Sequence, residues 1–211
     1  MRADRGCGLV LGYTPLVRIR PGSEWDSETF EQEDLSSADL RGCVFADCDF
    51  VDCTLTGVDM SRSVLDGCHF RGGDMSTCKV TDAKFRGICF TGTRLRGVLW
   101  TDVYQLGLEL SFVDSNLSYS SFFGLHLRDF KATGCTLHEV DFGEAVLKSA
   151  DFTKSDLAGA IFHRATLESV DFGSARNLAL DVRTAKMKKI KLSLEGAIAA
   201  LDVLGVEVVL E

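Results

Sequence analysis

A five-residue period runs through most of the chain and restricts its fold more than any other feature. From Leu35 to Trp100 every fifth residue is apolar, and the same holds from Phe112 to Phe172 after a shift of two residues. All positions of both runs are apolar in a chain that is only 45% hydrophobic. Chance does not give such a pattern, so the period indicates a structural repeat.

Each unit has the same order of residue types around its apolar centre. A small residue such as Cys48 or Ala150 lies two positions before the centre, Asp or Asn often directly before it, and Gly often two positions after it. An α-helix has 3.6 residues per turn and does not fit a period of five. Residues two apart on an extended chain share a face, and Gly and Asp suit turns. The unit therefore predicts a very short strand followed by a corner, in a narrow β-solenoid.

The units at 38–42 and 150–154 resemble the A(D/N)LxX repeat of the pentapeptide-repeat proteins. The resemblance covers residues 25–175 and implies an all-β fold, a right-handed quadrilateral β-helix with twenty residues per coil. Nearly seven coils would give a rod roughly 33 Å long. The expected organisation is an N-terminal extension (1–24), the β-helix (25–175) with a register break at 101–111, and a C-terminal cap of helix and strand (176–211).

Three segments are similar to the topoisomerase-protecting members of this family. Residues 30–40 resemble the first coil of the quinolone-resistance (Qnr) proteins, and residues 110–127 resemble the middle of the albicidin-resistance (AlbG) group. Residues 199–209 resemble the end of both groups and of the microcin-resistance (McbG) group. The resemblance implies a cytoplasmic homodimer that mimics DNA, binds DNA gyrase or topoisomerase IV, and protects it from a poison in antibiotic resistance or self-immunity. A non-enzymatic scaffold or protein-interaction module with another partner is the alternative.

Net charge argues against direct binding of nucleic acid. The chain has 23 basic and 31 acidic side chains, a net charge of −8, and lacks the basic footprint that phosphate binding needs. The densest acidic cluster lies at residues 24–34, where Glu28, Glu31 and Glu33 are candidates for contact with a basic protein surface. Acidic side chains on a protein surface also increase solubility. No wall of the predicted rod has an unbroken column of acidic residues.

The register break between Trp100 and Phe112 contains two residues more than the period allows. They must bulge outward or kink the rod. Tyr104, Gln105 and Glu109 are the exposed candidates for a partner contact there, and a mere irregularity is the alternative.

The C-terminus departs from the repeat. Ser193 can cap a helix that runs to Leu204, and a strand is expected over residues 206–210. The helix covers the end of the solenoid, either for its own chain alone or, as the resemblance implies, in a two-fold dimer. The dimer candidates are Leu194, Ile198, Leu201 and Leu204.

The cysteines and histidines do not indicate catalytic or metal chemistry. No C-x-x-C motif occurs, and core packing in a reducing compartment is expected for the six cysteines at small inward positions: Cys43, Cys48, Cys53, Cys68, Cys78 and Cys135. The histidines fall in or beside outward positions, and the common hydrolase and nucleotide-binding motifs are absent. No apolar run approaches the roughly 18 residues of a membrane span. We therefore expect no enzyme activity, no cofactor, no metal and no membrane association.

Overall fold

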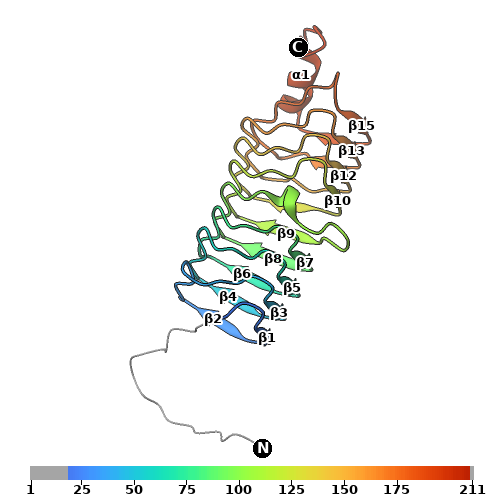
Figure 1. The fold of residues 1–211 in the computed structure, drawn as a ribbon. Coiled ribbons are helices and arrows are strands. Elements are labelled where there is room, and N and C mark those ends of the chain that lie inside the picture. Colours follow the sequence, from blue (N-terminus) through green and yellow to red (C-terminus); the bar gives the residue numbers. More distant parts are fainter. Residues whose placement is uncertain (1–18, 210–211) are drawn as a thin grey trace, which may run out of the picture.

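The computed structural model describes residues 19–209, which wind into a rod with four walls (Figure 1). Most of the N-terminal extension, residues 1–18, lies outside the described residues. Wall 1 consists of strands β1 (Glu24–Asp26), β3 (Val44–Ala46), β5 (Val64–Asp66), β7 (Lys84–Arg86), β10 (His126–Arg128), β12 (Val146–Lys148), β13 (Thr166–Glu168) and β15 (Lys186–Lys188). Wall 2 consists of β2 (Thr29–Glu31), β4 (Asp49–Val51), β6 (His69–Arg71), β8 (Ile88–Thr91), β9 (Leu110–Val113), β11 (Lys131–Thr133), β14 (Asp171–Phe172) and β16 (Lys191–Leu192).

Every coil pairs in parallel with its neighbours. On wall 1, Trp25 aligns with Phe45 and Phe45 with Leu65, an offset of twenty residues. Walls 3 and 4 have only isolated bridges, which start at Asp34↔Thr54 on wall 3 and at Asp39↔Asp59 on wall 4. Their offset is also twenty, except across the register break, where it is 22. A short 3₁₀ helix (η1, Trp100–Asp102) follows wall 4 at the register break. The predicted quadrilateral β-helix is confirmed.

The unit at residues 59–63 shows how the repeat forms. Met60 is the buried centre, and the Asp59 carboxylate accepts a hydrogen bond from the Ser61 amide at 2.9 Å, which fixes the start of the corner. Arg62 then takes a φ of 59°, and the next unit begins with the buried Ser63. A positive φ recurs at this corner position along the rod, which explains why glycine is frequent there.

The corner aspartates are held in their charged form. Six aspartates of the corners have a pKa below the usual 3.8, and in each the largest cause is a hydrogen bond that the carboxylate accepts from a side chain. They are Asp34, Asp39, Asp59, Asp156, Asp171 and Asp181. Hydrogen bonds to the charged form of a carboxyl favour that form. The Asp of the repeat thus contributes both a turn and a permanent negative charge at neutral pH.

Two ladders of aromatic rings fill the core. On wall 2, Phe50 stacks on Phe30 and Phe70 with ring centroids 4.8 and 4.6 Å apart. On wall 4, Phe142 stacks on Phe122 and Phe162 at 5.2 Å. Buried aromatic pairs contribute about 0.5–1.5 kcal/mol each beyond their burial. The small residues that lie two positions before each centre fill the remaining space.

The solenoid is longer than the sequence pattern predicted. Its expected end at residue 175 is wrong, because β15 pairs with β13 and β16 pairs with β14 at the usual offset of twenty. The chain thus makes about eight turns, roughly 38 Å at the inter-strand spacing. Helix α1 (Leu194–Asp202) follows β16 directly, and the Ser193 hydroxyl accepts a hydrogen bond from the Gly196 amide at 3.0 Å. The cap and helix are as predicted, but the helix ends two residues before Leu204.

The strand expected over residues 206–210 is not formed. Residues 206–209 belong to no strand, and residue 210 lies outside the described residues. The Val206 amide instead donates to the carbonyl of Leu201 at 3.1 Å, which closes the end of the helix over Gly205 with its φ of 76°.

Candidate protein-binding surfaces

The register break forms an outward loop on wall 1, where a strand would otherwise lie between β7 and β10. The Tyr104 amide still bonds to the carbonyl of Ala83, but Leu110 already pairs with Ile88 at an offset of 22. The two additional residues therefore lie between Tyr104 and Leu110, where the Leu108 amide closes a turn onto the carbonyl of Gln105 at 3.1 Å. We call residues 104–109 the bulge; it projects from the side of the rod (Figure 1).

The bulge exposes the residues that sequence analysis singled out. Tyr104 is 42% exposed and lies over the ammonium group of Lys84, which is 5.2 Å from its ring centroid. Gln105 and Glu109 are also exposed. Sequence reasoning missed Leu106, which at 73% exposure is the most open apolar side chain of the bulge. Tyrosine is enriched among the anchors of protein interfaces, so Tyr104 is the stronger anchor candidate, and Leu106 adds exposed apolar area to the same loop.

The acidic cluster lies at the first coil, but its members differ in position. Glu31 faces outward on wall 2, whereas Glu28 and Glu33 lie two residues before the centres Phe30 and Leu35. That is the inward position, which the coil above fills with Cys48 and Cys53. Glu28 is nevertheless exposed and Glu33 half-buried, since they belong to the first coil of the rod. Charges at the end of a solenoid oppose end-to-end pairing with other chains.

Negative charge is concentrated in the first three coils. Residues 24–83 contain 14 acidic and 4 basic side chains, a net charge of −10, whereas residues 84–209 contain 15 of each. The acidic groups occur on all four walls, as Asp66, Asp49, Asp74 and Asp59 illustrate. The rod thus has a strongly negative N-terminal part and a neutral remainder.

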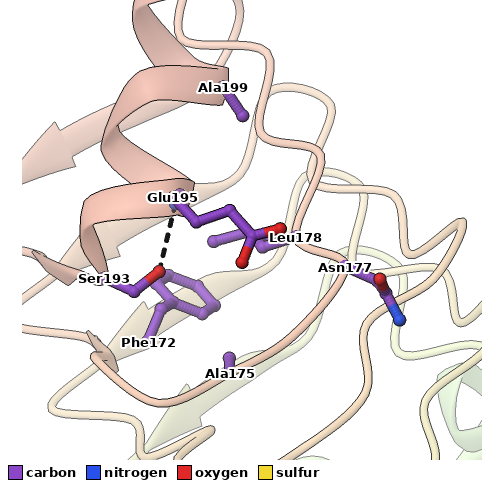
Figure 2. A pocket seen from close by; sticks show the side chains of 8 residues that line it. Phe172, Ala175, Asn177, Leu178, Ser193, Glu195 and Ala199 are labelled. Atoms are coloured by element: carbon purple, nitrogen blue, oxygen red, sulfur yellow. Dashed lines mark hydrogen bonds between the residues drawn. The ribbon is translucent and has the colours of Figure 1, made fainter. Parts of the chain in front are cut away.

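The C-terminal cap is apolar on its outer side. Leu194 is 67% exposed, Leu201 38% and Leu204 54%, while Ile198 is half-buried. Figure 2 shows the cavity of about 60 Å³ that remains between the first turn of α1 and the last coil, lined by Phe172, Leu178 and Ala199 among others. Three of the four dimer candidates therefore point away from their own chain.

The cysteines are part of the core. All six inward cysteines are buried, and the thiol of Cys78 donates to the carbonyl of Leu55 in the coil below at 2.9 Å. Burial raises the pKa of Cys68 to about 11 and those of Cys78 and Cys135 to about 12. These thiols stay protonated and unreactive at neutral pH.

Among residues 19–209, no group of three His, Cys, Asp or Glu side chains is placed to hold a metal ion. Within the same residues, no helix has the length and hydropathy that crossing a bilayer requires.

The coil geometry, the corner aspartates and the stacked centres define a β-solenoid protein built from five-residue units. Family models agree: one for a pentapeptide repeat region matches residues 23–100, and one for pentapeptide repeats in eight copies matches residues 135–173. Together they cover more than half of the chain, which therefore belongs to the pentapeptide-repeat family. The segment between the two matches contains the bulge.

Solved structures match the same fold. A trypsin-treated variant of QnrB1, a plasmid-mediated fluoroquinolone resistance protein, aligns with a TM-score of 0.58 and 17% identity, over 90% of this chain and 99% of that one. A second trypsin-treated QnrB1 variant aligns with a TM-score of 0.55 and 20% identity, over 90% of this chain and 92% of that one. A search of curated proteins gave no match.

Proposed function

We propose that this protein is a cytoplasmic, non-enzymatic DNA mimic that binds DNA gyrase or topoisomerase IV and protects the enzyme from a poison. The charge density of the first three coils supports this proposal most. Three coils span about 14 Å, so their net charge of −10 amounts to about one negative charge per 1.4 Å. Duplex DNA has one per about 1.7 Å. A basic surface that binds DNA would attract both in a similar way.

Two further features fit such a partner. The fluoroquinolone resistance reported for QnrB1 concerns a class of topoisomerase poison, and the two rods share their fold. The bulge offers an exposed anchor on wall 1, next to the boundary between the acidic and the neutral part. We also infer that the exposed leucines of the cap join two chains end to end, which would present two acidic parts at the far ends of a longer rod.

Association kinetics with immobilised gyrase and topoisomerase IV test the charge argument. The variant Glu24→Lys, Asp26→Lys, Glu31→Lys changes exposed outward positions of the first coil and avoids the inward Glu28 and Glu33. We expect its association rate to fall at least tenfold at low salt, and the difference to vanish at about 0.5 M salt, where charges are screened within a few ångströms.

A control triple applies the same charge change to the neutral part. Asp129, Glu139 and Glu144 are corner residues with positive φ, a position where Lys154 already occurs, so lysine is tolerated there. Replacing these three with lysine should slow association less than threefold. Equal effects of the two triples would reject the acidic part as the contact.

The bulge has a test of its own. Deleting Gln105 and Gly107 restores the ten-residue spacing between Trp100 and Phe112 and places Leu106 at an apolar centre of wall 1, so the solenoid should continue without a loop. Because an inserted apolar anchor holds a formed complex, we expect the deletion to raise the dissociation rate and to leave the association rate nearly unchanged. An unchanged dissociation rate would remove the bulge from the interface.

Protection is measured as DNA supercoiling by gyrase in the presence of a fluoroquinolone or an albicidin-like poison, with and without this protein. Restored supercoiling supports the proposal. If the wild-type protein binds neither enzyme at low salt, the proposal is wrong and the scaffold alternative remains.

A further inference from the structure

An open groove lies at the edge between walls 3 and 4, and neither the bulge nor the cap contributes to it. Its volume is about 630 Å³. Gly97 forms the floor of the groove. The same corner position is occupied in three successive coils by Thr77, Gly97 and Tyr119, so the glycine leaves a gap between two larger side chains. A Cβ on Gly97 would come within 3.6 Å of the Thr77 methyl group, so Thr77 borders the gap directly.

Two arginines of wall 3 line the groove, and only one of them is neutralised. Arg94 donates from Nε to the Asp74 carboxylate at 3.0 Å. Arg96 forms no ion pair within residues 19–209, and its guanidinium lies 5.4 Å from the ring centroid of Tyr119. The charged groups that line the groove thus leave one uncompensated positive charge beside an aromatic ring.

Tyr119 is costly where it stands. Its φ is +65°, a conformation that suits Gly, and an L residue with a bulky side chain is strained there. The ring is also 53% exposed, so its burial offsets little of that strain. Other coils place Gly57 and Gly159 at this corner, but also Thr77 and Glu139 with φ of 56° and 53°. Tyr119 differs from these residues in its exposed aromatic ring, which points to a role other than stability.

We propose that this groove binds a small, planar aromatic carboxylate. The guanidinium of Arg96 would pair with the carboxylate in the planar, bidentate manner that suits arginine. The aromatic part would lie over Gly97, against the ring of Tyr119. A single uncompensated positive charge suits a monoanion such as a carboxylate better than a phosphate dianion. Asp74 and Thr77 at one edge of the groove belong to the acidic part, whereas Arg96 and Tyr119, the groups that would bind the ligand, lie beyond it. This proposal therefore does not depend on the topoisomerase function.

The probe is 2-naphthoate, titrated into the isotope-labelled protein and followed by the backbone amide shifts of Gly97 and Tyr119. A ligand of about a dozen heavy atoms in an open groove should bind with a dissociation constant on the order of 1 mM. The neutral 2-naphthamide and the non-aromatic cyclohexanecarboxylate should each bind at least tenfold more weakly. Equal binding of either compound, or no shift at these amides with 2-naphthoate, would overturn the proposal.

Two variants separate binding from folding. Arg96→Gln and Tyr119→Gly should each weaken 2-naphthoate binding at least tenfold, and Tyr119→Gly should also raise the melting temperature because it relieves the strain at φ +65°. The matched control is Lys84→Gln, which removes the cation over Tyr104, the other exposed tyrosine among residues 19–209. It should bind 2-naphthoate like the wild type. Unchanged binding in both groove variants, or a lower melting temperature of Tyr119→Gly, would refute the assignment of Tyr119 to a ligand.

Discussion

Gly73 is the glycine of the rod whose missing side chain would come closest to the backbone of the neighbouring coil. It occupies the small inward position of its unit with a φ of +69°, and it follows another positive-φ glycine, Gly72. A Cβ at Gly73 would lie 2.2 Å from the carbonyl oxygen of Cys53 and 2.9 Å from its nitrogen. Both atoms belong to the backbone of the coil below, so no side chain can move to relieve the contact.

Gly73→Ala should therefore destabilise the rod by two separate effects. The left-handed conformation alone costs an L residue about 1–2 kcal/mol. To bring the contact beyond 3.0 Å the coils must separate locally. The separation weakens two hydrogen bonds between coils. The Asp74 amide donates to the carbonyl of Cys53 at 2.9 Å, and the Arg94 amide donates to the carbonyl of Gly73 at 3.2 Å. At about 1 kcal/mol for each hydrogen bond, the total is about 3–4 kcal/mol.

The control is Gly92→Ala, at the wall 2 corner one coil above Gly72. Its φ is +62° and a Cβ there would meet nothing within 4 Å, so only the conformational cost applies. For a chain of this size 1 kcal/mol corresponds to about 2–4 °C. The melting temperature of Gly73→Ala should thus lie at least about 4 °C below that of Gly92→Ala. Equal melting temperatures in scanning calorimetry would refute the argument that the contact between backbones limits this position.

Four further predictions follow from the core, the corners and the cap. Ser63→Ala should raise the melting temperature by about 2–4 °C, because the buried Ser63 hydroxyl has no hydrogen-bond partner and its desolvation costs about 1 kcal/mol. Phe142→Asp should prevent folding or lower the melting temperature by more than about 10 °C, since it buries a charge and forfeits about 1.5–3 kcal/mol of burial, whereas outward Thr153→Asp should be nearly neutral. Leu194→Glu with Leu201→Glu should give monomers in light scattering while the circular dichroism spectrum is retained; a monomeric wild type would remove the dimer. Thermal stability should persist on acidification to about pH 4 and be lost progressively below it. The corner aspartates have lowered pKa values in the folded state, so their contribution to stability disappears as the pH falls through those values. A midpoint of acid unfolding above about pH 5 would contradict this.

The five-residue period was sufficient to predict the fold because each unit is a local structure. Neighbours within five residues determine the buried centre, the corner and the aspartate that caps it. Four such units close one coil, so paired strands are twenty residues apart in the sequence. The predicted end of the solenoid was wrong because Asn177 interrupts the apolar positions. Val182, Met187 and Leu192 continue the same register beyond it, and Leu180 is buried in place of a wall 4 centre. The repeat tolerates one polar position, so Asn177 does not mark its end.

The surfaces could be predicted less well, because they depend on residues that lie far apart in the sequence. The groove at Gly97 requires Thr77 and Tyr119 to lie one coil below and one coil above it. The only sequence signal was a tyrosine at a corner where glycine is common. The strand expected near the C-terminus failed for a similar reason: its apolar residues have no neighbouring edge to pair with among residues 19–209.

The distribution of acid along the rod separates a structural role of aspartate from a functional one. Corner-capping aspartates occur in both parts, for example Asp59 and Asp171, so the repeat itself makes any such rod somewhat acidic. They cannot explain why residues 24–83 contain 14 acidic groups in 60 positions and only 4 basic ones. Acidic residues after the centres contribute to this difference through their density. Six occur in these 60 positions, Asp26, Glu31, Asp47, Asp52, Asp66 and Asp82, against six in the 126 positions of residues 84–209. Asp47, Asp52 and Asp82 occupy positive-φ corner positions that Arg62 and Thr77 fill in other units, so the turn itself does not require acid there. Because the mutual repulsion of these charges opposes folding, selection for the external field of the rod is the physical reason that remains.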